Sequence, residues 1–233
     1  MGNCITLGSI EQDLSSIKEP VMLTLSVSVK NYTNSWEFFV YPAQLPDAGK
    51  DVYVTQTLDD KAKQLLKKGG KVLLTLKHGT LAKDKGGDIA IGFSTIFWNT
   101  AWTGGQPPVT MGILCDPLNP ALSQFPTQEF SNYQWWDAMS HSGAIELDKV
   151  SKGLQPVVRV IDDWVTARSL GLVFECSVGK GKLIVSGIDL LSDTQNRPEA
   201  RQLLYSLKKY MAQDTFKPSQ PVTIDNITAL YKK

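Results

Sequence analysis

The chain has 233 residues, of which 42% are hydrophobic and 20% charged, the balance of a globular protein with one large domain or with one large and one small domain. Its 24 basic and 23 acidic residues leave a net charge of +1, which argues against nucleic-acid binding, because that function needs a strongly basic face. No apolar run reaches the roughly 18 residues of a membrane span. Three cysteines and two histidines without metal-like spacing predict neither a metal site nor a cofactor.

The first predicted element is a β-hairpin within residues 21–41. Every second residue from 23 to 29 is apolar, which is the period of a strand with one buried face. Residues 31–35 are typical of a turn, and the β-prone residues 36–41 predict a second strand that Pro42 ends. A two-stranded hairpin is marginal in water, so we expect it to pack on the following domain or on strands outside this chain.

A βαβ unit is predicted next. Residues 52–55 form a short apolar strand, and residues 59–68 show an amphipathic helical pattern with Asp59 or Thr57 placed to cap it. Gly69 and Gly70 end this helix, and residues 71–77 are a second buried strand. Two such strands joined through a helix imply a parallel pair with a right-handed crossover.

The remaining pattern extends this α/β arrangement. A glycine turn at 179–181 predicts one antiparallel pair, and residues 198–211 form a closing helix with Pro198 in its first turn. Further strands are expected at residues 91–97, 112–115, 157–161, 172–178 and 181–188.

Residues 92–119 carry the first candidate for chemistry, Cys115. A cysteine hydrolase needs a thiolate, a base and an oxyanion hole, and in α/β folds the nucleophile usually sits on a tight, glycine-flanked elbow. Cys115 is followed by Asp116 and Pro117 and has no such glycines. His141, in a Ser-His-Ser sequence, is the candidate base. The competing interpretation is that Cys115 is a buried, unreactive thiol.

Four tryptophans in turn-rich segments are the second candidate. Exposed indoles stack on the apolar faces of sugars, while amide and carboxylate groups bind the hydroxyls. The competing interpretation is that the indoles fill space beneath a long loop and that the carboxylate at 163 caps a turn. The candidate ligand-binding residues are Trp98, Asn99, Trp102, Trp135, Trp136 and Asp163.

Five segments together resemble a known group of proteins. They are NYTNSWEFFVYP, VYVTQTLDDKAKQLLKKGGKVLLTL, FSTIFWNTAWTGGQPPVTMGILCDPLNPALSQFPT, YQWWDAMS and FECSVGKGKLIVSGIDL. They resemble the C-terminal part of Bacteroidetes proteins related to family-two glycoside hydrolases, the β-galactosidase-like group. The resemblance implies the end of an immunoglobulin-like sandwich in residues 1–44, and a class I glutamine-amidotransferase-like, ThuA-like domain in residues 45–215. A C-terminal tail, 216–233, would follow. The implied fold is flavodoxin-like, a mostly parallel sheet between helices.

The departures from these relatives shape the functional expectation. Working glutamine amidotransferases carry a Gly-x-Cys-x-Gly elbow and a His-x-Glu pair, and this chain has neither. The glycosidase barrel is also absent, so no catalytic residue is carried over. We therefore expect a non-catalytic accessory domain of a carbohydrate-degrading protein, acting in interdomain packing, oligomerisation or sugar contact. Its partners would be carbohydrate, other domains of a parent glycosidase or a second copy, and the resemblance suggests a periplasmic or outer-surface location. The alternatives are a ThuA-like sugar-binding module and a hydrolase using Cys115 or His141.

Overall fold

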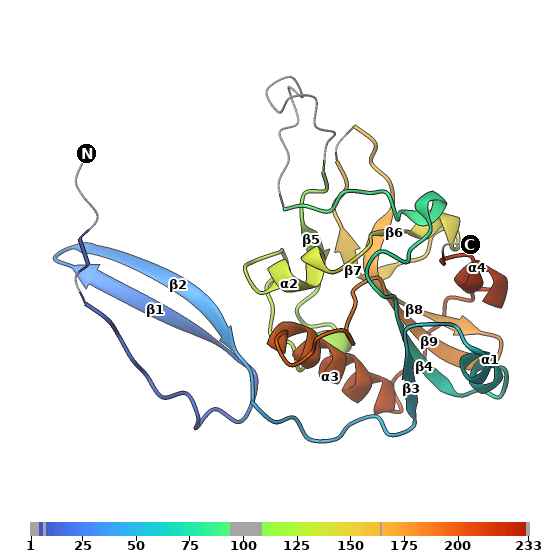
Figure 1. Cartoon of the computed structure of the whole chain (residues 1–233), viewed down its shortest axis with the longest axis horizontal. Helices are drawn as coiled ribbons and strands as arrows, with labels where there is room; N and C mark the ends of the chain where they lie inside the picture. Colours follow the sequence, from blue (N-terminus) through green and yellow to red (C-terminus); the bar gives the residue numbers. More distant parts are fainter. Residues whose placement is uncertain (1–4, 7, 94–108, 164, 232–233) are drawn as a thin grey trace.

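The computed structural model describes residues 5–6, 8–93, 109–163 and 165–231. Figure 1 shows a β-hairpin near the N-terminus that stands apart from a larger α/β body, with one extended segment joining the two. The described residues form a two-stranded sheet and a seven-stranded sheet with helices, which confirms the mixed α/β class and the hairpin.

The hairpin consists of β1 (Val21–Val29) and β2 (Tyr32–Val40), paired antiparallel without a bulge. The turn is tighter than predicted, because β2 begins at Tyr32 instead of at residue 36. Lys30 takes a left-handed conformation with φ of 53°, which lets two residues reverse the chain. The β-prone Tyr32 and Thr33 are then free to extend the second strand.

The larger sheet has the order β3-β4-β9-β8-β7-β5, with β6 beside β8. Its β3/β4 and β4/β9 pairs are parallel, and its other pairs are antiparallel. Four of these six pairs among the described residues are antiparallel, so the expectation of a mostly parallel sheet is wrong. The turn at Gly179 and the short β7–β8 connection cannot supply the crossover of about a dozen residues that parallel strands need. The strands are β3 (Val52–Thr55), β4 (Lys71–Thr75), β5 (Ile113–Cys115), β6 (Ile145–Glu146), β7 (Pro156–Val160), β8 (Leu170–Val178) and β9 (Gly181–Ser186).

The βαβ unit is confirmed, with α1 (Asp60–Lys67) between the parallel strands β3 and β4. Asp59 is the N-cap, since its Oδ1 accepts a hydrogen bond of 2.7 Å from the amide of Ala62. Gly69 ends the helix in a left-handed conformation with φ of +89°.

Helices cover both faces of the sheet. On β4, Leu73 packs into the cluster that includes α2 (Trp135–Ser140) and α3 (Pro198–Ala212). Val72 and Leu74 point the other way, into the cluster that includes α1 and α4 (Ile224–Thr228). Alternate residues of a strand face opposite sides, so one strand serves both cores. The described residues also form the short 3-10 helices η1 (Lys83–Lys85), η3 (Pro120–Leu122) and η4 (Leu147–Lys149).

Two segments differ from their sequence expectations. Residues 91–93 are not in a strand, and the rest of the strand expected at 91–97 lies outside the described residues. The described part of the expected tail packs on the body, because Ile227 of α4 and Leu230, two residues after the helix, are completely buried.

Candidate functional site

Three of the predicted ligand-binding residues, Trp98, Asn99 and Trp102, lie outside the described residues. The two neighbouring tryptophans of α2 have different environments. Trp135 is fully buried, and its Nε1 donates a hydrogen bond of 2.9 Å to Thr127 Oγ1. Trp136 is 60% exposed and stacks on Phe93 with 5.4 Å between ring centroids. Only the second indole of this pair is therefore placed to meet a ligand.

Cys115 lies at the end of β5 and is buried. Its Sγ donates a hydrogen bond of 3.3 Å to the carbonyl oxygen of Gln128. Burial raises the pKa of this thiol to about 11, with a smaller contribution from the negative charges of Asp116 and Glu129. A thiol with such a pKa is protonated at neutral pH and is a poor nucleophile, which favours the interpretation of Cys115 as an unreactive residue.

Asp163 is buried and bonded within its own loop. Its Oδ1 accepts hydrogen bonds of 2.9 Å from the amides of Val165 and Thr166. The neighbouring Asp162 accepts two hydrogen bonds from the Arg168 guanidinium. These contacts favour the turn-capping interpretation of Asp163 over a ligand-binding one.

A different group of residues meets at the carboxyl ends of the parallel strands β3, β4 and β9. Open α/β sheets place ligands outside this edge of the parallel strands. His78 follows β4 there, and Asp189 follows β9. His141, at the end of α2, comes to the same place: its ring lies edge-on to that of His78, with 6.3 Å between centroids. The two rings are the only histidines of the chain.

His141 is oriented by Asp137, one helical turn earlier. Its Nδ1 lies 2.9 Å from the carbonyl oxygen of Asp137 and 3.3 Å from Asp137 Oδ1. A carbonyl oxygen can only accept, so Nδ1 carries the hydrogen and Nε2 is the remaining ring nitrogen for other contacts. Asp137 is in turn held by Arg197, which donates to both carboxylate oxygens at 2.9–3.0 Å.

Asp189 connects the segments that follow β3, β4 and β9 to one another. Its carboxylate accepts hydrogen bonds from Gln56 Nε2 at 2.9 Å, from the His78 amide at 3.2 Å and from Ser192 Oγ at 2.8 Å. Burial by itself raises the pKa of Asp189, but the hydrogen bonds from Ser192, the His78 amide and the Leu191 amide outweigh it and hold the pKa below its usual value. The Asp189 carboxylate therefore has a structural role, holding the backbone at His78 and the side chain of Gln56 in place.

A cavity of about 280 Å³ opens beside His78. It is lined by both apolar and polar residues, and the lining residues include no acidic side chain. We call it the His78 cavity. It is lined by His78, Gly79, Leu81, Gly87, Ile89, Ile91, Met139, Ser140, Ser142 and Gly143.

Sequence reasoning named His141 but missed His78, Asp137, Asp189 and Arg197 as its neighbours. One signal was present: His78 and Asp189 directly follow two predicted buried strands of an α/β pattern. Arg197 and Asp137 carried no comparable signal, because they meet only after α2 and the loop before α3 have packed.

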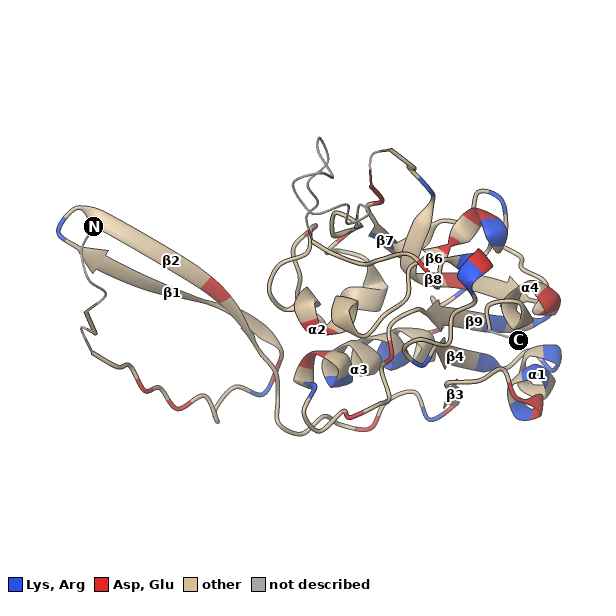
Figure 2. Cartoon of the chain, turned by 45° about the horizontal axis from the view of Figure 1, so that its top comes forward, with Lys and Arg blue, Asp and Glu red and all other residues tan. Residues whose placement is uncertain are grey.

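The hairpin presents a second surface of interest. In its register, Leu23 opposes Phe38, Leu25 opposes Trp36, and Val29 opposes Tyr32, so all these side chains share one face. Most of the other face is polar, with hydrogen bonds between opposed hydroxyl groups, and its apolar pair is Met22 opposite Phe39 at the end near the body. Figure 2 shows that few residues along the two strands are charged. We call the first face the apolar hairpin face: Leu23, Leu25, Val27, Val29, Tyr32, Trp36 and Phe38.

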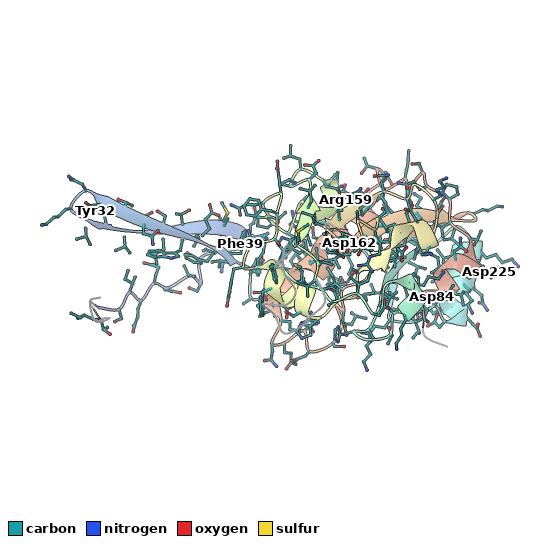
Figure 3. The ribbon with its side chains drawn as sticks, turned by 90° about the horizontal axis from the view of Figure 1, so that it is seen from above. Tyr32, Phe39, Asp84, Arg159, Asp162 and Asp225 are labelled. Atoms are coloured by element: carbon teal, nitrogen blue, oxygen red, sulfur yellow. The ribbon has the colours of Figure 1, made fainter. Side chains whose placement is uncertain are left out.

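This apolar face is open. Trp36 is 50% exposed, Phe38 41% and Tyr32 82%, and among the described residues no third strand joins β1 and β2. Figure 3 places Tyr32 at the far end of the hairpin and Phe39 where the hairpin approaches the body. The hairpin is tied to the body near that end, where Gln128 donates a hydrogen bond of 2.6 Å to Glu37.

Among the described residues, no group of three or more His, Cys, Asp or Glu side chains could hold a metal ion. In the same part of the chain, no helix has the length and apolar character needed to cross a membrane. The sequence pattern of a protein family described as a domain of unknown function (DUF8487) matches residues 53–232. A second pattern, also described as a domain of unknown function (DUF8488), matches residues 1–42. A comparison with curated proteins found no match.

Proposed function

This chain belongs to the family described as domain of unknown function DUF8487, and we propose that it is a non-catalytic accessory domain that docks through its hairpin onto a β-sandwich. The parent would be a carbohydrate-degrading protein related to family-two glycoside hydrolases, as the sequence resemblance implies. The α/β body would belong with the glutamine-amidotransferase-like and ThuA-like domains. The parallel β3-β4-β9 part of the sheet, with helices on both faces, supports that assignment.

The observation that carries this proposal is the open apolar hairpin face. An isolated two-stranded hairpin is at best marginally stable in water, and an exposed row of large apolar side chains marks an interaction surface. Here Leu25, Trp36 and Phe38 line up on one face, each about two-fifths to one-half exposed. Sheets stack face to face at about 10 Å through such side chains, so a second sheet is the natural cover.

The polar face shows that the two strands place apolar and polar side chains on opposite sides of the hairpin. Ser26 pairs with Ser35 and Ser28 with Thr33, each pair joined by a hydroxyl hydrogen bond of 2.8 Å. A hairpin that was solvated on both faces would not need this segregation. The two strands therefore have the pattern of the last hairpin of a sandwich, with one face for the second sheet and one for water.

Photo-crosslinking in the cells that make the protein tests the docking. A benzophenone-bearing phenylalanine analogue replaces Trp36 on the apolar face, and the matched control carries it at Ser35 on the polar face. We expect the probe at 36, and not that at 35, to crosslink to a β-sandwich domain of a carbohydrate-degrading protein. Equal yields at both positions, or products confined to the body of the same chain, would contradict the docking. A sandwich from a protein unrelated to carbohydrate would contradict the proposed setting.

Sugar contact is a second candidate function, and the observation that favours it is Trp136. Its indole is 60% exposed and is held flat by Phe93, with 9° between the ring planes. A fixed, open indole is suited to stacking on a sugar ring. Titration with galactose and with oligosaccharides, followed by the indole N–H resonances, should shift Trp136 and spare Trp36. Unchanged resonances for Trp136 at saturating sugar would contradict this function.

A further inference from the structure

We propose that the His78 cavity binds a small organic carboxylate, whose charged end lies between the imidazoles of His78 and His141. This site lies at the edge of the parallel strands, so binding there depends neither on hairpin docking nor on sugar contact at Trp136.

The cavity lies at a position where α/β sheets commonly bind ligands. It opens beside the residue that follows β4, at the carboxyl edge of the parallel strands β3, β4 and β9. Chain connections diverge at this edge and leave concave sites there, which is where α/β sheets bind ligands. A volume of about 280 Å³ lies near the lower end of the ~300–1,000 Å³ range of ligand pockets, so the occupant is a single small molecule.

His78 and His141 have ring nitrogens that remain available for hydrogen bonds to a ligand. Among the described residues, neither ring nitrogen of His78 has a hydrogen-bond partner, and His78 is exposed at the cavity. At His141, Asp137 occupies Nδ1 and leaves Nε2. When His141 is protonated, its Nε2 also carries a hydrogen, and two imidazoles with ring centroids 6.3 Å apart can then offer N–H donors from two directions to one oxyanion.

The local charges favour an anion over a cation. The carboxylates of Asp137 and Asp189 are already engaged, Asp137 by Arg197 and Asp189 by Gln56, Ser192 and the His78 amide. Their oxygens already accept hydrogen bonds from these donors, so the two carboxylates are poorly suited to bind a cation. The groups left at the cavity include the imidazole of His78, which becomes positive on protonation, and the hydroxyl of Ser140, while the His141 ring lies beside His78.

The apolar lining residues select an organic carboxylate over a bare inorganic anion. Leu81 and Met139 are buried core residues that line the cavity together with the apolar Ile89 and Ile91. Covering these residues with a carbon skeleton removes apolar surface from water, whereas a hydrated phosphate ion gains nothing there. The lining therefore fits a ligand with a carbon body and one carboxylate, such as a sugar acid.

The two histidines make the test direct, because the imidazole C–H region of the NMR spectrum contains only their signals. The intact chain is titrated with glucuronate, with glucose and with inorganic phosphate. We expect saturable shifts of both imidazoles with glucuronate, and at most weak shifts with the other two. Equal shifts with glucose would overturn the role of the carboxylate, equal shifts with phosphate would overturn the role of the carbon body, and no shift with any of the three would overturn the site.

Variants assign the binding to the imidazoles. His78→Gln removes a ring on an exposed loop, and we expect about a tenfold loss of glucuronate affinity, as for loss of one hydrogen bond to a charged group. Lys67→Gln removes a charge from α1 on the other face of the sheet and is the matched control, with affinity unchanged. Far-UV circular dichroism confirms that both variants fold. Equal affinity losses in the two variants, or none in His78→Gln, would overturn the proposal.

Discussion

Arg197 and Asp137 form a buried ion pair that joins two segments far apart in the chain. Arg197 Nη2 lies 2.9 Å from Asp137 Oδ2, and the two side chains are only 6% and 18% exposed. Arg197 also donates to the carbonyl oxygens of Asp189 and Ser192, at 2.7 Å and 3.0 Å. Through these bonds the loop after β9 is fastened to α2, and His141 is held beside His78.

Replacing Arg197 with Met should therefore destabilise the fold strongly. The change leaves the Asp137 carboxylate buried without its cation and removes donors from two carbonyl oxygens, so we expect a loss of about 3–5 kcal/mol in the free energy of unfolding. Urea denaturation measures it. Lys63→Ala is the control, since its 3.9 Å contact with Asp60 is largely exposed and should be worth less than about 1 kcal/mol. Similar losses in the two variants would contradict this account of the pair.

The adjacent residues Trp135 and Trp136 should respond in opposite ways to the same substitution. Trp135→Ala empties a fully buried site and orphans the Thr127 hydroxyl, so we expect a loss of about 3–5 kcal/mol in unfolding free energy. Trp136→Ala removes a half-open ring whose main recorded contact is Phe93, and about 1 kcal/mol or less should be lost. Urea unfolding of both variants decides it, and a larger loss at 136 than at 135 would reverse the assignment.

The thiols of Cys115 and Cys176 should not react in the folded protein. Burial raises their pKa values to about 11 and about 12, so the thiolate is scarce at neutral pH. In a Cys4→Ser background we expect no labelling by Ellman's reagent under native conditions, and labelling of both thiols in concentrated guanidinium chloride. Fast, stoichiometric labelling of native Cys115 would instead revive the hypothesis of a cysteine nucleophile.

Acid should weaken the fold partly through Asp189. Its pKa is lower in the folded protein than the ordinary value of 3.8, since hydrogen bonds from Ser192 and the His78 amide outweigh the effect of burial. A carboxylate with a lowered folded pKa adds stability above pH 3.8, and this stability is lost as the pH falls through that value toward the folded pKa.

Asp189→Asn should therefore lower the unfolding free energy at neutral pH by roughly 1–3 kcal/mol and should flatten its decline on acidification. Urea denaturation at neutral pH and at several acidic pH values measures both effects. Asp214→Asn is the control and should leave the pH profile unchanged, because Asp214 is exposed and its carboxylate makes no hydrogen bond to another described residue. An unaltered acid limb in Asp189→Asn would show that this carboxylate does not contribute as described.

Local sequence signals were sufficient for the elements whose causes are local. Alternation revealed β1, and the capping residue Asp59 together with Gly69 bounded α1 to within one residue of the prediction. The direction of the strands was harder to predict from the sequence. The predicted parallel sheet is mixed, because the short connections before and after β8 force antiparallel pairing regardless of how apolar the strands are.

By itself the sequence determined the α/β class, the amphipathic hairpin, the βαβ unit and the absence of amidotransferase motifs, since each depends on residues close together in the chain. Tertiary structure alone decided that Trp135 is core while Trp136 is open, that Cys115 is a buried thiol, and that His78 meets His141 above Asp189. Those outcomes depend on which distant segments pack together, and burial, hydrogen bonding and ring contacts are properties of that packing, which no local pattern encodes.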